Sequence, residues 1–124
     1  MADVKSTVMD FYDLAFQQKD PAAAREKFMG STYTQHNPQA PDGPEGFVGA
    51  IGGMFQAFPD FTSEVKRIIT EGDLVVIHHE VHMAPGDDGM AVVDIFRVEG
   101  DKIVEHWDVL QPIPTEAAND NGMF

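Results

Sequence analysis

Four segments in the second half of the chain, each rich in valine and isoleucine, alternate with short turns that contain glycine and aspartate. They cover residues 61–70, 73–83, 89–99 and 101–110. Segments of this length and composition predict β-strands, and connections of only a few residues place consecutive strands antiparallel to one another. The sequence therefore predicts a four-stranded antiparallel meander.

The first half of the chain has the pattern of helices. Apolar residues recur every three or four positions over 3–19, which predicts an amphipathic helix. Pro21 begins a second, short helix over 21–29, and a third is predicted over 44–58, after an extended piece at 33–36 and an irregular loop. Helices followed by a run of strands predict an α+β domain with the helices packed on one face of a curved sheet.

Composition limits the classes of function. The 124 residues, of which 43% are hydrophobic, predict a single globular domain over 1–124, with a polar tail at 112–124. The net charge of −13 would repel phosphate backbones and anionic membranes, so we expect neither a nucleic acid nor a membrane partner. The chain has no cysteine, and its first residues are acidic where a signal peptide would be basic, so we expect a cytoplasmic protein.

Side chains alternate between the two faces of a strand, so the parity of the residue numbers sorts the chemistry of each predicted strand. In segment 101–110, His106 and Asp108 share a face with apolar neighbours, whereas Ile103 and Trp107 fall on the other face. An aspartate that holds an imidazole fixes its tautomer and prepares it for proton transfer near neutral pH. We interpret the two residues as an acid/base pair, with a solvated edge strand as the alternative.

Asp94 is the single polar residue on a strand face that also carries Val92, Phe96 and Val98. Because an isolated buried charge is very costly, such a carboxyl group must be paired, hydrogen-bonded or protonated. One interpretation pairs Asp94 with Arg97 or a backbone donor. The other keeps it protonated, with a raised pKa, in an apolar pocket where it donates a hydrogen bond to a substrate oxygen.

Three ionisable residues, His78, Glu80 and His82, share one face of the segment 73–83. A solvated strand face explains them, and so does a site for zinc or iron. Alternate residues of one strand lie roughly 7 Å apart at their Cα atoms, which is strained geometry for three ligands, so we expect no metal and no cofactor. His36 lies where the short extended piece enters the loop, either as an exposed histidine or as part of a site.

Over essentially its whole length the chain resembles the nuclear transport factor two-like superfamily. Within that superfamily the segments YTQHNPQAPDGPEGF and AVVDIFRVEGDKIVEHWDV are most similar to SnoaL-like polyketide cyclases. The resemblance implies a cone-shaped, cystatin-like α+β barrel, in which a curved antiparallel sheet and N-terminal helices enclose a pocket.

The resemblance also implies roles for individual residues. Asp94, with Arg97 three residues later, matches the protonated aspartate of ketosteroid isomerases, which are members of the superfamily. Asp108 matches the catalytic aspartate of limonene epoxide hydrolases, on the strand after the Gly-Asp-Lys-Ile turn. The isomerase general base falls near Asn37, which is no efficient base, so the chain departs from the steroid isomerases at this position.

The chain also departs from the epoxide hydrolases. Their Arg-x-Asp pair on the preceding long strand falls at Glu80 and His82, and their loop asparagine falls at His36. These departures argue against epoxide hydrolysis and leave the SnoaL-like cyclases as the most similar group.

We therefore predict a cofactor-independent acid/base enzyme that removes a proton α to the carbonyl of a small apolar substrate, in an aldol cyclisation or an isomerisation. The alternative is a non-catalytic small-ligand-binding or dimerisation domain of the same fold. Apolar residues on the convex face of the sheet lead us to expect a homodimer. The expected catalytic residues are Asp108, His106 and Asp94, and the expected substrate-binding residues are His36, Asn37, His78, Glu80, His82, Phe96 and Trp107.

Overall fold

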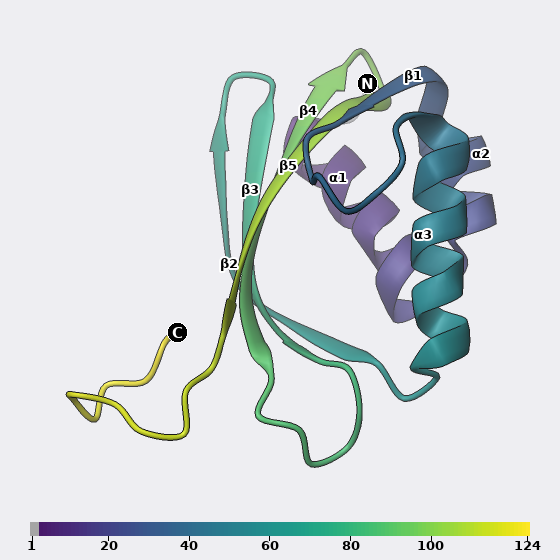
Figure 1. Ribbon diagram of the computed structural model, residues 1–124. Helices are drawn as coiled ribbons and strands as arrows, with labels where there is room; N and C mark the ends of the chain where they lie inside the picture. Colours follow the sequence, from purple (N-terminus) through teal and green to yellow (C-terminus); the bar gives the residue numbers. More distant parts are fainter. Residues whose placement is uncertain (1–2) are drawn as a thin grey trace.

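A single curved, unclosed sheet of five strands, in the order β1-β5-β4-β3-β2, organises the computed structural model, which describes residues 3–124 (Figure 1). The strands are β1 (Met29–Gln35), β2 (Thr62–Glu71), β3 (Leu74–His82), β4 (Met90–Glu99) and β5 (Lys102–Pro112). Strands β2 to β5 pair antiparallel in sequence order, which confirms the predicted meander.

The helices lie on one face of the sheet, so the α+β prediction is confirmed (Figure 1). They are α1 (Val4–Tyr12), its π-helical continuation η1 (Asp13–Gln17), α2 (Pro21–Phe28) and α3 (Gly43–Ala57). The side chain of Asp3 accepts a hydrogen bond from the Ser6 amide at 2.7 Å and so caps the start of α1. Among the described residues, no helix combines the length and the apolar character needed to cross a membrane.

Strand β1 is longer than the predicted extended piece and takes Met29 from the predicted second helix. It pairs parallel with β5, with Met29 opposite Ile103 and Gln35 opposite His106. A segment of Gly, Ser and Thr has little strand pattern of its own, and its partner lies about 70 residues later in the sequence. The start of β1 is therefore held in the sheet by hydrogen bonds to β5 and is not predicted by the local sequence.

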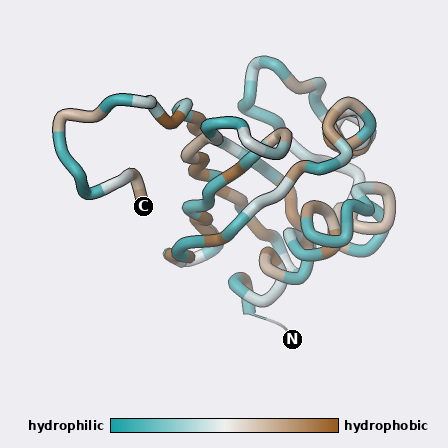
Figure 2. Tube along the Cα trace, turned by 90° about the horizontal axis from the view of Figure 1, so that it is seen from below, coloured by the Kyte–Doolittle hydropathy of each residue, from teal (hydrophilic) through white to brown (hydrophobic). Residues whose placement is uncertain are grey.

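The core fills the space between the concave face of the sheet and the helices. Phe11 of α1 is 0% exposed and its ring contacts those of Phe28, Phe47 and Phe96 at centroid distances of 5.4 to 6.2 Å. Figure 2 shows hydrophobic stretches concentrated along the strands in the centre of the molecule. These contacts fix the helical layer to the sheet, because aromatic pairs combine large buried area with preferred geometry.

A β-bulge at Val104 changes which side chains of β5 point inward. Ile103 lies opposite Val98, but Glu105 lies opposite Arg97, so Val104 is an extra residue in β5. Ile103 consequently belongs to the core, although strict alternation places it on the face opposite His106. The parity prediction for Ile103 is wrong for this reason, whereas His106 and Asp108 do share one face, as predicted.

We expect Phe11→Ala to lower the free energy of unfolding by about 3–5 kcal/mol, because it removes a fully buried ring that the surrounding side chains cannot replace. Phe58→Ala is the control, since it makes the same substitution at a residue that is 40% exposed, and it should cost clearly less. Urea unfolding followed by circular dichroism measures both values. Equal effects of the two substitutions would contradict the position of the core.

Candidate functional site

A pocket of about 210 Å³ opens between the sheet and helix α3. Most of its wall is apolar and includes Phe47, Ile51 and Met54 of α3. Six polar side chains also line it, namely Gln35, Asn37, His79, Asp94, His106 and Asp108. A mainly apolar cavity with a few polar groups linked to one another is the usual form of a small-molecule site.

Asp94 is the centre of this polar group. The residue is 7% exposed, and it points inward from β4 because it shares a strand face with the buried Val92 and Phe96. Its Oδ1 lies 2.7 Å from His106 Nε2, and its Oδ2 lies 2.5 Å from His79 Nε2. Asp94 is thus held by two imidazoles, one from each neighbouring strand.

The alternative that pairs Asp94 with Arg97 is wrong. Arg97 points to the outer face of the sheet, where it donates to Glu99 at 2.8 Å and to Glu105 at 2.7 Å. The two residues are three positions apart on one strand, so alternation separates them onto opposite faces.

Asp94 is a carboxylate rather than the protonated acid that we expected. Burial by itself raises the pKa of Asp94, but hydrogen bonds from His106 and His79, together with their charges, outweigh burial and lower the pKa from 3.8 to about 2. The expectation of a raised pKa is therefore wrong. It assumed an apolar surrounding and did not include two imidazole donors.

The hydrogen bonds of His106 require both of its ring nitrogens to carry protons. Nδ1 lies 2.8 Å from Gln35 Oε1, which also accepts from the Asn37 amide at 2.9 Å and is thereby fixed as the oxygen end of the Gln35 side chain. Nε2 faces the Asp94 carboxylate. With an acceptor at each nitrogen, His106 forms both bonds only as an imidazolium.

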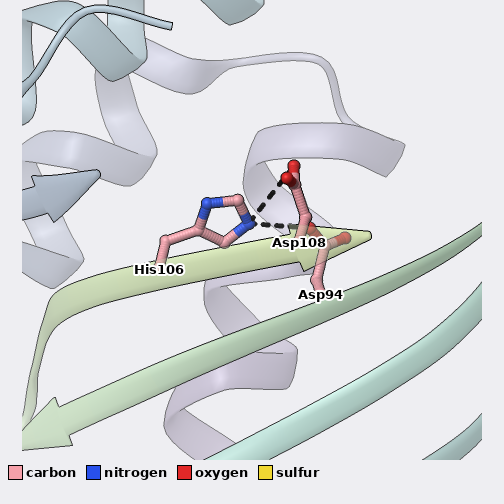
Figure 3. Close-up of side chains that lie close together, drawn as sticks. All are labelled: Asp94, His106 and Asp108. Atoms are coloured by element: carbon pink, nitrogen blue, oxygen red, sulfur yellow. Dashed lines mark hydrogen bonds and ion pairs between the residues drawn. The ribbon is translucent and has the colours of Figure 1, made fainter. Parts of the chain in front are cut away.

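Asp108 lies beside this ion pair, with Oδ2 at 3.9 Å from His106 Nε2 (Figure 3). The side-chain amide of Asn37 donates to Asp108 Oδ2 at 3.0 Å. Asn37 Oδ1 accepts from the Gln39 amide at 2.8 Å, so the Asn37 nitrogen is the end that faces Asp108. His106 and Asp108 come together as expected, but Asp94, rather than Asp108, makes the close contact that orients the imidazole.

His79 is the residue of this site that the sequence analysis missed. It is 3% exposed, and its Nδ1 lies 2.9 Å from both Tyr12 Oη and Ser63 Oγ. A signal was present, because alternation places His79 on the same face as the apolar Val75 and Ile77, just as it places Asp94 among apolar residues. The greater number of ionisable residues on the opposite face of β3 drew the interpretation there.

His78, Glu80 and His82, which we expected to bind substrate, lie outside the pocket lining. Alternation along β3 turns them to the outer face, because Val75, Ile77, His79 and Val81 point into the core. Their contacts are with other groups of the outer face. Arg67 donates to His78, while His82 lies 2.7 Å from both Glu80 and Asp87.

His36 and Trp107 also lie outside the pocket lining. Their rings stack in parallel at a centroid distance of 4.9 Å, and His36 Nε2 lies at hydrogen-bond distance, 2.7 Å, from Glu105 Oε2. We expected these two residues to contact substrate, and the structure places both on the other side of the sheet edge from the pocket lining. The lining does include Asn37 and Phe96, which were expected there.

The arrangement also defines where a metal ion could bind. One donor atom each from Asp94, His106 and Asp108 lies within 4.8 Å of the other two. These are different residues from the histidines and glutamate of the outer face that sequence suggested as ligands. A cation here would have to displace the proton that His106 Nε2 shares with Asp94, so the hydrogen bonds present favour proton chemistry.

The chain belongs to the SnoaL-like domain family. Residues 8–106 match the model of the SnoaL-like domain. The cyclase-type resemblance seen in the sequence is therefore confirmed at the level of the family. A search of curated proteins finds no significant match.

Solved structures share the fold. TsrD from Streptomyces laurentii is 22% identical, with 89% of this chain and 91% of that one covered and a TM-score of 0.72. Wild-type IdmH from Streptomyces antibioticus, a proposed polyketide cyclase, is 24% identical over 88% and 92% of the chains, with a TM-score of 0.71. An uncharacterized cystatin fold protein from Novosphingobium aromaticivorans is 17% identical over 88% and 99%, with a TM-score of 0.73.

We expect Asp94→Asn to lower the free energy of unfolding by about 2 kcal/mol at pH 7. Since the pKa of Asp94 is lower in the folded than in the unfolded protein, its contribution is complete above pH 4 and disappears as the pH falls to about 2. The difference between wild type and variant should close over the same interval in urea titrations.

Asp88→Asn serves as the control, because Asp88 is exposed in the β3–β4 turn and its substitution should change the free energy of unfolding little. An Asp94→Asn variant as stable as the wild type at pH 7 would contradict the charged state assigned to Asp94.

Proposed function

We propose that the protein is a cofactor-independent acid/base enzyme of the polyketide cyclase type, acting on a small apolar carbonyl compound. The observation that carries this proposal is a carboxylate, Asp108, at the wall of an apolar pocket and 3.9 Å from an imidazolium. A carboxylate at the wall of an apolar pocket can accept a proton from a bound carbonyl compound, and a fixed positive charge beside it can stabilise the anion that proton removal creates.

In the proposed reaction, Asp108 accepts the proton from the carbon next to the substrate carbonyl. The electron pair of the broken C–H bond forms an enolate, whose negative charge replaces that of Asp108 near the His106 imidazolium. In an aldol cyclisation, the enolate carbon attacks a second carbonyl, and the new alkoxide takes the proton back from Asp108. In an isomerisation, Asp108 returns the proton to a different carbon.

The size of the pocket supports a small substrate. An engineered apolar cavity of about 150 Å³ holds one benzene ring, and pockets for drug-sized ligands start near 300 Å³. At about 210 Å³ this pocket accommodates a compound of one or two rings. The proposed cyclase activity of IdmH, which shares the fold, agrees with chemistry on polyketide carbonyls.

We expect Asp108→Asn to lower kcat by 10²-fold to 10⁴-fold on 1,3-dicarbonyl compounds of one or two rings, because the variant keeps the shape of the site but lacks the base. Glu105→Gln makes the same chemical change on the outer face of β5 and should retain activity. Rates are measured by the loss of substrate absorbance between pH 4 and 9. Background rates in the wild type, combined with tight binding of the same compounds, would favour the non-catalytic ligand-binding alternative.

We also propose that the partner is a second copy of the chain, bound through the outer face of the sheet. In one row across four strands of that face, Ile69, Val76, Ile95 and Trp107 lie opposite one another. Val109, in the next row, is 66% exposed. A contiguous apolar band of this kind is common at protein interfaces.

Light scattering of the wild type should give twice the mass of one chain, and Val109→Asp should reduce it to that of a monomer. Asp88→Asn, which lies outside the band, should not change it. A wild-type monomer at 100 µM would refute the homodimer.

A further inference from the structure

We infer that Met54, Met83 and Met90 form an adaptable binding site for the apolar end of the substrate, at the end of the pocket away from Asp108. The inference rests on the proposed function for the position of the reacting carbonyl group. The contact between the three methionines and an apolar ligand can be measured without any reaction.

The three methionines come from different elements and meet at one end of the pocket. Met54 lies on α3, Met83 directly follows β3, and Met90 is the first residue of β4. All three line the pocket and pack against the same small hydrophobic cluster, which is distinct from the main core. Each of them is only partly buried, so together they form a wall beside open space rather than part of a closed core.

The register of β4 and β5 gives the pocket a polar end and an apolar end. Asp94 lies opposite Asp108, and Val92 lies opposite Leu110. Met90 is on the same face of β4, four residues before Asp94, so the two Cα atoms are roughly 13 Å apart at about 3.3 Å per residue. Val92 and Leu110 line the pocket between the two ends. A ligand with its carbonyl group at Asp108 therefore directs its remaining atoms along apolar surface towards the methionines.

The two ends differ in how firmly their side chains are held. Methionine is unbranched, fills irregular spaces and makes favourable contacts with aromatic rings through its polarizable sulfur. At the polar end, by contrast, Asn37 donates to Asp108 at 3.0 Å and is itself fixed by the Gln39 amide. We therefore expect the protein to be strict about the position of the carbonyl group and tolerant of the shape of the apolar group.

Three compounds test the inference, because they share a 1,3-dicarbonyl group and differ only in the apolar group attached to it. Acetylacetone has no ring, benzoylacetone has one ring, and naphthoylacetone has two fused rings. NMR of the full chain with ¹³C-methyl-labelled methionine reports the contact, since a bound aromatic ring shifts the signals of neighbouring methyl groups. Benzoylacetone and naphthoylacetone should shift the signals of the three pocket methionines. Those of Met9 and Met29, which lie outside the pocket lining, should stay in place.

A larger side chain at the apolar end separates the two ends of the pocket. Met90→Trp should weaken the binding of naphthoylacetone about tenfold and that of acetylacetone less than about twofold, because only the longer ligand reaches position 90. Met54→Phe makes a similar change from the side of helix α3 and replaces Met90→Trp if that variant does not fold. Met123→Trp, in the C-terminal tail and outside the pocket lining, is the matched control and should change neither affinity.

The outcomes distinguish this inference from the proposed function. Unchanged methionine signals in a protein saturated with naphthoylacetone would refute the inference, and so would a lack of binding or an equal loss of both affinities in Met90→Trp. Shifted signals in a wild type that converts none of the three compounds would retain the methionine site and refute the proposed function instead. The Asp108→Asn variant should keep the methionine shifts, because its substitution lies at the polar end.

Discussion

The whole inner face of the sheet depends on how one buried carboxylate is neutralised. Asp94 lies in the middle of the central strand, where water cannot solvate its charge, and a charge in that position requires partners. The neighbouring strands supply one imidazole each, and these imidazoles are in turn held by Tyr12, Ser63 and Gln35. The hydrogen bonds thus connect helix α1 and strands β1 to β5 through a single group.

The sequence analysis gave Asp108 two roles, to orient His106 and to react with substrate. In the structure, different residues serve these two roles. Asp94 orients His106 and is itself held by His79, and both Asp94 and His79 are almost completely enclosed. Asp108 and Asn37 lie beside the ion pair at the pocket wall, where a bound molecule can reach them. An enzyme of this kind benefits from such a division, because the orienting groups can be rigid while the reacting group remains accessible.

The fold was largely predictable, since the strand segments, their turns and the helical periodicities are local signals. The position of Asp94 was predictable as well, because a single carboxyl on an apolar strand face is unusual. Its protonation was not, since that depends on His79 and His106, which adjoin Asp94 only through strand pairing. Only the end of strand β1 was predicted, as the extended piece at 33–36, because its partner β5 is distant in sequence. The position of His78, Glu80 and His82 on the outer face was not predictable, because parity shows which residues share a face but not which face is covered by helices.

The extra residue at Val104 makes the length of β5 as important as its composition. It allows Ile103 to remain in the core while His106, only three positions later, faces the cavity. Hydrophobic packing therefore determines which side chains point inward before the bulge, and the polar groups of the pocket determine it after the bulge. An insertion of one residue between 106 and 108 would leave the packing of Ile103 intact and turn Asp108 towards the outside, so such a change would separate folding competence from function without altering a single side chain of the core.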